Sequence, residues 1–143
     1  MITVSGPVLQ AGCVAVAGRG ILIEGPPGSG KSSLALALID RGAVLVGDDG
    51  VLLSYRAGQL WAAPHPNTPG LLEVRNLGII RFPCLAEARV CLKLRLDPAA
   101  PRHIDHAPGE IVGGAEIPVV QLWPGSEVLA LRAELALSHY GLK

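Results

Sequence analysis

Short apolar runs separated by glycines predict the elements of the first third of the chain. Two runs at 13–17 and 21–24, apolar except for Glu24, stand on either side of a Gly-Arg-Gly sequence, which is the pattern of two strands joined by a tight turn. The segment SSLALALIDRG repeats its leucines at helical spacing and ends at Gly42, which predicts a short helix with glycine as its C-cap. The next run, AVLVGDD, predicts a buried strand that ends in two acidic residues.

Alternating residues in the middle of the chain predict further strands. VLLSYRAGQLWAA has the pattern of a hairpin that turns at Ala57-Gly58, LLEVRNLGIIRF that of a broken extended segment, and ARVCLKLRL that of a strand. Residues 64–70 and 97–109 each carry three prolines, and we therefore expect both to be loops.

A second helix is expected at the end of the chain. The segment SEVLALRAELALSHYG offers Ser126 as an N-cap. Val128, Leu131 and Leu135 lie at the spacing of a helix side that faces a core. No repeat and no shift of composition marks a domain boundary. The whole pattern predicts one α/β domain over residues 1–143, with a mixed sheet and few helices.

The composition limits which binding partners and which cellular compartment we expect for this domain. Half of the 143 residues are hydrophobic and the formal net charge is zero, so we expect no binding to nucleic acid. No apolar run reaches the length of a membrane-spanning helix, and the first ten residues lack the pattern of a signal peptide. The three cysteines form no C-x-x-C pair, which argues against a disulfide framework or a zinc site. We expect a cytoplasmic protein without a membrane partner.

The most informative motif is GPPGSGKSS, residues 25–33. It matches the phosphate-loop pattern G-x-x-x-x-G-K-[ST] between a predicted strand and a predicted helix, the context that this motif requires. Its glycines allow backbone N–H groups to turn toward one anion. Lys31 supplies a charge for the β- and γ-phosphates, and Ser32 supplies a hydroxyl ligand for Mg²⁺. The predicted nucleotide-binding residues are Gly25, Pro26, Pro27, Gly28, Ser29, Gly30, Lys31, Ser32 and Ser33.

Two adjacent acids, Asp48 and Asp49, end the strand that follows the predicted helix. If this strand runs parallel to the one before the glycine loop, its carboxyl end lies beside the loop. Adjacent residues of a strand point to opposite faces, so one acid can reach the metal or brace the loop while the other meets an attacking hydroxyl. The alternative interpretation is a pair of turn-forming acids at a strand end.

Three segments together, GPPGSGKSS, LVGDD and LLEVRNLGII, resemble the HPr kinase/phosphorylase family in its short form, which has only the catalytic domain. The resemblance implies an enzyme that uses ATP and Mg²⁺ to phosphorylate a serine of the phosphocarrier protein HPr, and that reverses this by phosphorolysis. It also implies a role in the regulation of carbohydrate metabolism and of the phosphotransferase system. It also implies a phosphate-loop fold similar to the nucleotide domain of phosphoenolpyruvate carboxykinase, and a hexamer.

Roles for single residues follow from this resemblance where the motifs match. Residues 25–32 would bind ATP, and Ser32 and Glu73 would ligate Mg²⁺. Asp49 would be the base for the HPr serine in the kinase direction and the acid in reverse, with Asp48 in support. Phosphoryl transfer needs in-line positioning, charge neutralisation and a proton acceptor, and these residue types can supply all three.

Two arginines are candidates for contact with the phosphates. Arg75 lies two residues beyond Glu73 and therefore on the same face of an extended chain; the alternative for this pair is a surface ion pair. Arg102 is the one arginine of 97–109, and its position matches an arginine that the family carries in a mobile loop.

The chain departs from the family pattern at three places. Gln10 stands 15 residues before the first loop glycine, where the family usually carries a catalytic histidine. Gln10 can donate and accept hydrogen bonds but cannot carry a proton at neutral pH. Asn76 replaces a signature glycine, and Ser126 stands where the family tends to have an arginine tied to the dephosphorylation direction. These departures leave open a nucleotide-binding sensor of the same fold without turnover.

The four histidines of the sequence give no clear metal pattern. His103 and His106 flank Asp105 in a polar segment that we interpret as a solvated loop rather than a metal site. His65 and His139 stand alone, and we interpret both as structural or surface residues.

A third alternative is a switch or small-molecule kinase that shares only the glycine loop. The LLEVRNLGII segment and the lack of an N-K-x-D motif argue against it.

Overall fold

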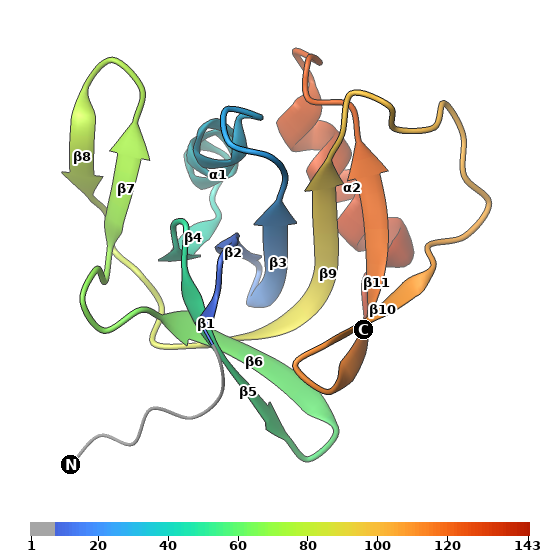
Figure 1. The fold of residues 1–143 in the computed structure, drawn as a ribbon, viewed down its shortest axis with the longest axis horizontal. Coiled ribbons are helices and arrows are strands. Elements are labelled where there is room, and N and C mark those ends of the chain that lie inside the picture. Colours follow the sequence, from blue (N-terminus) through green and yellow to red (C-terminus); the bar gives the residue numbers. More distant parts are fainter. Residues whose placement is uncertain (1–7) are drawn as a thin grey trace.

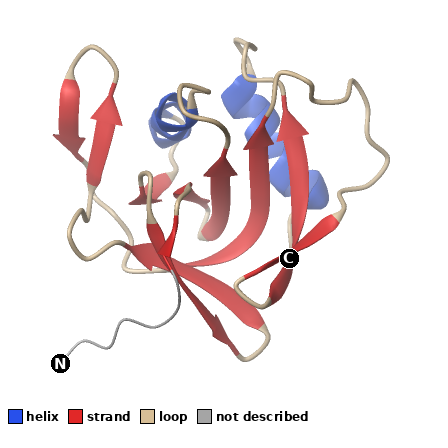
Figure 2. Cartoon of the chain, in the orientation of Figure 1, coloured by secondary structure: helices blue, strands red, loops and turns tan. Residues whose placement is uncertain are grey.

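A computed structural model describes residues 8–143, and its central feature is a curled nine-stranded sheet with two helices and a separate two-stranded hairpin (Figures 1 and 2). The strands are β1 (Val8–Leu9), β2 (Gly12–Val16), β3 (Arg19–Glu24), β4 (Val44–Gly47), β5 (Val51–Arg56), β6 (Gln59–Pro64), β7 (Leu71–Val74), β8 (Gly78–Arg81), β9 (Ala88–Leu96), β10 (Gly109–Val112) and β11 (Ala115–Leu122). The helices are α1 (Lys31–Asp40) and α2 (Leu129–Tyr140).

The sheet has the order β1-β5-β6-β9-β3-β2-β4, and β11 with β10 is attached to β9. The beginning of β9 pairs with β6, and its end pairs with β11 in parallel. One long strand thus joins two arms of the sheet, which curl around it (Figure 1). The β7–β8 hairpin stands apart, next to α1. The prediction of a mixed sheet with few helices is confirmed.

The two hydrophobic cores lie on opposite faces of β3. Its residues Ile21, Leu22 and Ile23 are fully buried, as expected for a strand that is covered on both sides. Ile21 and Ile23 belong to the cluster that contains both helices. Leu22 belongs to the cluster that β5, β6 and the β10–β11 hairpin close.

The strands and the helix around the glycine loop form as the pattern predicts, but the turn between β2 and β3 lies earlier than the expected Gly18-Arg19-Gly20. The β2–β3 hairpin turns at Ala17-Gly18, both in the left-handed region, as a two-residue hairpin requires. Helix α1 buries Leu34 and Leu38. It ends at Gly42 with φ 108°, where Gly42 and the next residue donate back to the last turn of the helix in a Schellman-type cap.

The predicted contact side of the last helix is wrong. Val128, Leu131 and Leu135 are 48%, 42% and 49% exposed. Helix α2 instead buries Ala133, Ala136 and Leu137, because small alanines let the helix approach β9 and β11 closely. The spacing of the larger apolar side chains does not predict which side of the helix is buried in this way. The predicted N-cap is also shifted: Ser126 accepts a hydrogen bond from the Val128 N–H at 3.1 Å, but the helix begins only after Val128.

Two hairpins go beyond the sequence pattern. The broken extended segment at 71–82 is the β7–β8 hairpin. The β10–β11 hairpin, which turns at two glycines with positive φ, was not predicted at all. The expected loop after β9 is present and runs from residue 97 to the start of β10.

The described residues also bear on the membrane and cysteine predictions. Over residues 8–143 no helix has the length and apolar character to cross a membrane. All three cysteines are free. Cys13 and Cys91 are buried, and burial raises the pKa of the Cys13 thiol to about 12.

Candidate active site

The glycine loop, residues 25–32, joins β3 to α1 at the carboxyl edge of the sheet. Gly28 and Gly30 have φ of 79° and 99°, angles that glycine adopts without strain. A Cβ at either position would meet no atom within 4 Å, so no neighbouring side chain fills the space beside these two glycines. The Ser29 hydroxyl is buried and has no hydrogen-bond partner among residues 8–143. The loop leads into the N-terminus of α1, where an anion is stabilised.

Lys31 is the first residue of α1, and its ammonium spans the loop. Lys31 Nζ donates a hydrogen bond to the carbonyl oxygen of Gly25 at 2.8 Å. This contact holds the ammonium charge next to the loop. Among residues 8–143 Lys31 forms no ion pair with an acidic side chain that a bound phosphate would have to break. The residue types and their open cradle fit the polyphosphate of a nucleotide.

Asp48 connects the three elements that surround the loop. Its Oδ1 accepts a hydrogen bond from the Ser32 hydroxyl at 2.7 Å, and its Oδ2 accepts one from the backbone N–H of Glu73 at 3.0 Å. The predicted neighbourhood arises because β3 and β4 both pair antiparallel with β2, so they run in the same direction and their carboxyl ends share one edge.

The two acids do not lie on opposite faces as the strand pattern predicts. β4 ends at Gly47, and Asp49 has a left-handed φ of 59°, so the alternation of a strand no longer holds. Both side chains line one cavity of about 520 Å³ together with Gln10, Lys31 and Glu73. A positive φ is uncommon for residues other than glycine, although aspartate adopts it more readily than most, and such conformations cluster at functional sites.

A second cavity, of about 410 Å³, opens on the other side of Lys31 and Ser32. It is lined by the last glycines of the loop and by Glu73, Arg75 and Asn76 of the β7–β8 hairpin. No ion pair joins Glu73 to Arg75 in the described part of the chain, so the surface ion pair alternative is not realised there. The structure thus brings Arg75 to the loop, as its spacing suggested.

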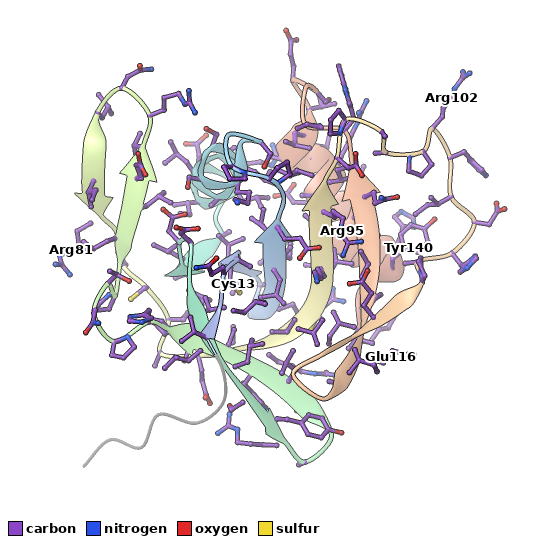
Figure 3. All side chains as sticks on the ribbon, viewed as in Figure 1. Cys13, Arg81, Arg95, Arg102, Glu116 and Tyr140 are labelled. Atoms are coloured by element: carbon purple, nitrogen blue, oxygen red, sulfur yellow. The ribbon has the colours of Figure 1, made fainter. Side chains whose placement is uncertain are left out.

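Arg102 does not lie in either cavity. It lines a different hollow between the 97–108 loop and α2, with Trp123 and Tyr140. Figure 3 shows the Arg102 side chain pointing away from the body of the molecule. Its catalytic role stays a prediction.

The sequence interpretation missed an ion-pair network beside the loop. Glu24 directly precedes Gly25, and its carboxylate pairs with Lys93 at 2.9 Å and with Arg95 at 2.5 Å. Both cations also pair with Glu110 of β10, at 3.3 and 2.9 Å. The hydrogen bond from Arg95 lowers the pKa of Glu110. Lys93 and Arg95 stand two residues apart on β9 and therefore on one face, a spacing that could have pointed to this network.

Among residues 8–143 no three His, Cys, Asp or Glu side chains lie close enough together to hold a metal ion by themselves. Mg²⁺ in nucleotide sites usually needs only one or two protein oxygens besides phosphate and water. The Ser32 hydroxyl and the Glu73 carboxylate line the same two cavities, so the residues present fit such a metal.

The fold and this edge of the sheet define a family. The family model described as "HPr Serine kinase C-terminal domain" matches residues 6–86, which include the glycine loop, the acid pair and the β7–β8 hairpin. The chain belongs to this family.

Individual relatives are named HPr kinase/phosphorylase. The HPr kinase/phosphorylase of Clostridium tetani is 51% identical over 72 residues, which are 50% of this chain and 24% of that protein. That of Mycoplasmopsis pulmonis is 46% identical over 67 residues, 47% of this chain and 22% of that protein. The matched part of the chain thus spans about a quarter of these relatives.

A solved structure matches over nearly the whole chain. The Hpr(Ser) kinase/phosphatase from Coxiella burnetii has a TM-score of 0.82 and 26% sequence identity, and the match covers 92% of this chain and 94% of that one. The mixed α/β fold with its curled sheet is therefore that of the HPr kinases.

Proposed function

We propose that this chain is an ATP- and Mg²⁺-dependent protein serine kinase that phosphorylates the phosphocarrier protein HPr. The observation that carries the proposal is the position of Asp48, which binds Ser32 of the glycine loop and the backbone of Glu73 at once. This contact holds the loop, the acid pair and the β7–β8 hairpin around one cavity. The family and the names of the relatives support HPr as the protein substrate.

The finer parts of the proposal concern fold, assembly and setting. The glycine loop acts as a phosphate loop in a single catalytic domain over residues 1–143, similar to the nucleotide domain of phosphoenolpyruvate carboxykinase. The chain works in the cytoplasm as a hexamer, and its product takes part in the regulation of carbohydrate metabolism and of the phosphotransferase system. The fold similarity, the hexamer and the regulatory role rest on the family resemblance, whereas the single domain and the cytoplasmic location rest on the pattern and composition of the sequence.

In this proposal the loop binds the nucleotide by its backbone and by Lys31. The N–H groups after Gly28 and at the start of α1 neutralise phosphate oxygens. Lys31 Nζ leaves the Gly25 carbonyl for the β- and γ-phosphates, a short movement of a flexible side chain. Arg75 faces the same phosphates from the hairpin.

Mg²⁺ supplies charge neutralisation on the transferred phosphoryl group when it is bound. Ser32 and Glu73 are the residues that would hold it. Both carboxylate oxygens of Asp48 already accept hydrogen bonds, so Asp48 serves to orient Ser32 and the hairpin. Asp49 accepts no such bond among the described residues, and its exposed carboxylate is free to take the proton of the serine hydroxyl.

The experiment is transfer of labelled phosphate from ATP to the HPr of the same organism. Asp49→Asn should abolish the transfer and keep ATP binding, whereas Asp40→Asn, at the exposed end of α1, should change neither. Persistent transfer by Asp49→Asn would show that another group is the base. Tight ATP binding by the wild-type chain without any transfer would contradict the kinase and leave a nucleotide-binding sensor.

The reverse reaction needs a test of its own. Gln10 lines the cavity beside Asp48 and Asp49 but cannot carry a proton at neutral pH. We expect slow phosphorolysis of seryl-phosphorylated HPr in the presence of phosphate, and a faster reaction for Gln10→His. Equal rates for both proteins would show that position 10 does not limit this direction.

A further inference from the structure

A third cavity, of about 490 Å³, reaches the acid pair from the side away from the glycine loop. It shares Gln10, Asp49 and Glu73 with the loop cavity, but none of its lining residues belongs to residues 25–32. The β6–β7 loop contributes His65, Asn67 and Thr68 to its lining. A protein serine that approaches Asp49 from this side therefore meets the imidazole of His65. His65 does not stand alone, because it lines this cavity together with the acid pair. The structural role expected from the sequence holds in the turn that it forms with Asn67.

The ring of His65 is held in one orientation by its own loop. The backbone N–H of Asn67 donates to His65 Nδ1 at 3.1 Å, and the His65 carbonyl accepts from the Thr68 N–H at 3.1 Å. With Nδ1 as acceptor, the neutral ring carries its proton on Nε2. Nε2 has no hydrogen-bond partner among residues 8–143, so its N–H is available to a ligand in the cavity.

The residues on either side of His65 reduce the conformational entropy that is lost when its ring is held in this orientation. Pro64 and Pro66 flank the histidine; each fixes its own φ, and Pro66 also restricts the backbone of His65. The loop then leads into β7, where the Glu73 backbone is tied to Asp48. A ring held between two prolines and a tethered strand is preorganised for contact.

The third cavity is lined by acidic side chains, and a phosphate that enters it needs hydrogen-bond donors such as His65 Nε2. Its ionised side chains are the acids Asp48, Asp49 and Glu73, whereas Lys31 belongs to the other cavities. A phosphate carried by a serine on this side would be repelled by the acids unless donors face it. The donors that line the cavity are Gln10 and the polar groups of the β6–β7 loop.

We propose that His65 contacts the phosphoserine of the phosphorylated protein and donates a hydrogen bond from Nε2 to its phosphate. The proposal rests on the proposed function, because it assumes that a protein serine is the acceptor. His65 thereby distinguishes the phosphorylated from the unmodified protein. The contact is one of binding and needs no proton transfer by the imidazole.

Two substitutions separate this contact from a role in the turn. In His65→Asn the amide oxygen can still accept the Asn67 N–H, but nothing reaches the place of Nε2. In His65→Gln the amide nitrogen reaches that place and can donate. The control is His139→Gln on the exposed side of α2.

The experiment measures binding of seryl-phosphorylated HPr and of unmodified HPr to each protein by calorimetry, without nucleotide. We expect His65→Asn to bind the phosphorylated form about 10-fold more weakly, as for loss of a hydrogen bond to a charged group. Its affinity for unmodified HPr and its melting temperature should stay at the wild-type value. His65→Gln should recover most of the affinity for the phosphorylated form.

Three results would overturn the assignment of His65. These are wild-type affinity of His65→Asn for phosphorylated HPr, an equal loss for both forms of HPr, and a glutamine variant as weak as the asparagine variant. If the wild-type chain binds neither form of HPr and does not phosphorylate it, the proposed function itself fails, which is a different outcome. The affinity of the control should match the wild type throughout.

Discussion

Lys93 is the one charged or polar residue that is buried among residues 8–143, and its removal tests how the glycine loop is anchored. Its ammonium lies 2.9 Å from Glu24 and 3.3 Å from Glu110, and its side chain is 9% exposed. We predict that Lys93→Met destabilises the fold, because two carboxylates are left with Arg95 as their single partner.

The magnitude follows from the burial of the partners. Removing one member of a fully buried ion pair costs about 3–5 kcal/mol. Glu24 and Glu110 are 24% and 39% exposed, so solvent screens part of this cost, and methionine keeps the packing of the lysine stem. We expect a loss of about 2 kcal/mol. With an m-value of about 2 kcal/mol/M, the urea midpoint falls by about 1 M.

The assay is urea denaturation followed by circular dichroism, with a double variant as control. Lys93→Met with Glu24→Gln removes one of the stranded carboxylates and should recover about 1 kcal/mol of the loss. The reasoning is refuted if the single variant keeps the wild-type midpoint or raises it, because the network would then be tolerated rather than stabilising.

Three further predictions concern the loop, the cysteines and the response to acid. Gly30→Ala should lose ATP binding, measured by calorimetry, and cost about 1–2 kcal/mol of stability, because φ is 99° there. A thiol reagent should label Cys84 in the native protein but not Cys13, whose pKa burial raises to about 12, until urea unfolds the chain. Arg95 lowers the pKa of Glu110 in the folded protein. The ionised Glu110 carboxylate therefore stabilises the fold at neutral pH, and this stabilisation is lost as the pH falls below the unfolded-state pKa of about 4.3. The melting temperature of Glu110→Gln should lie below that of the wild type at pH 7 and approach it at pH 3.

The sequence predicts the glycine loop and its neighbours well because their signals are local. A strand, a loop and a helix follow one another within 22 residues, and Gly42 ends the helix by its own backbone preference. The acid pair was placed correctly next to Ser32, because strand direction alone decides which edge it reaches. Its two side chains were placed wrongly, because Asp49 leaves the strand conformation.

Other features depend on contacts between distant segments. The exposed side of α2 was mistaken for its buried side because the helix packs by alanines rather than by leucines. His65 reaches the acid pair through a loop between β6 and β7, and no spacing in the sequence measures that distance. Arg102 was placed by position in a long loop, and the fold carries that loop to α2.

The most direct test of the proposed function is to locate the phosphate after incubation of the chain with Mg²⁺, ATP and HPr. Tandem mass spectrometry on the acid-stable product identifies the modified residue. The arrangement of Lys31, Ser32 and the acid pair around one cavity predicts a single phosphate on a serine of HPr, formed only when ATP and Mg²⁺ are both present. Unmodified HPr, recovered from a mixture in which the chain has demonstrably bound ATP, would contradict phosphoryl transfer as the function of this site.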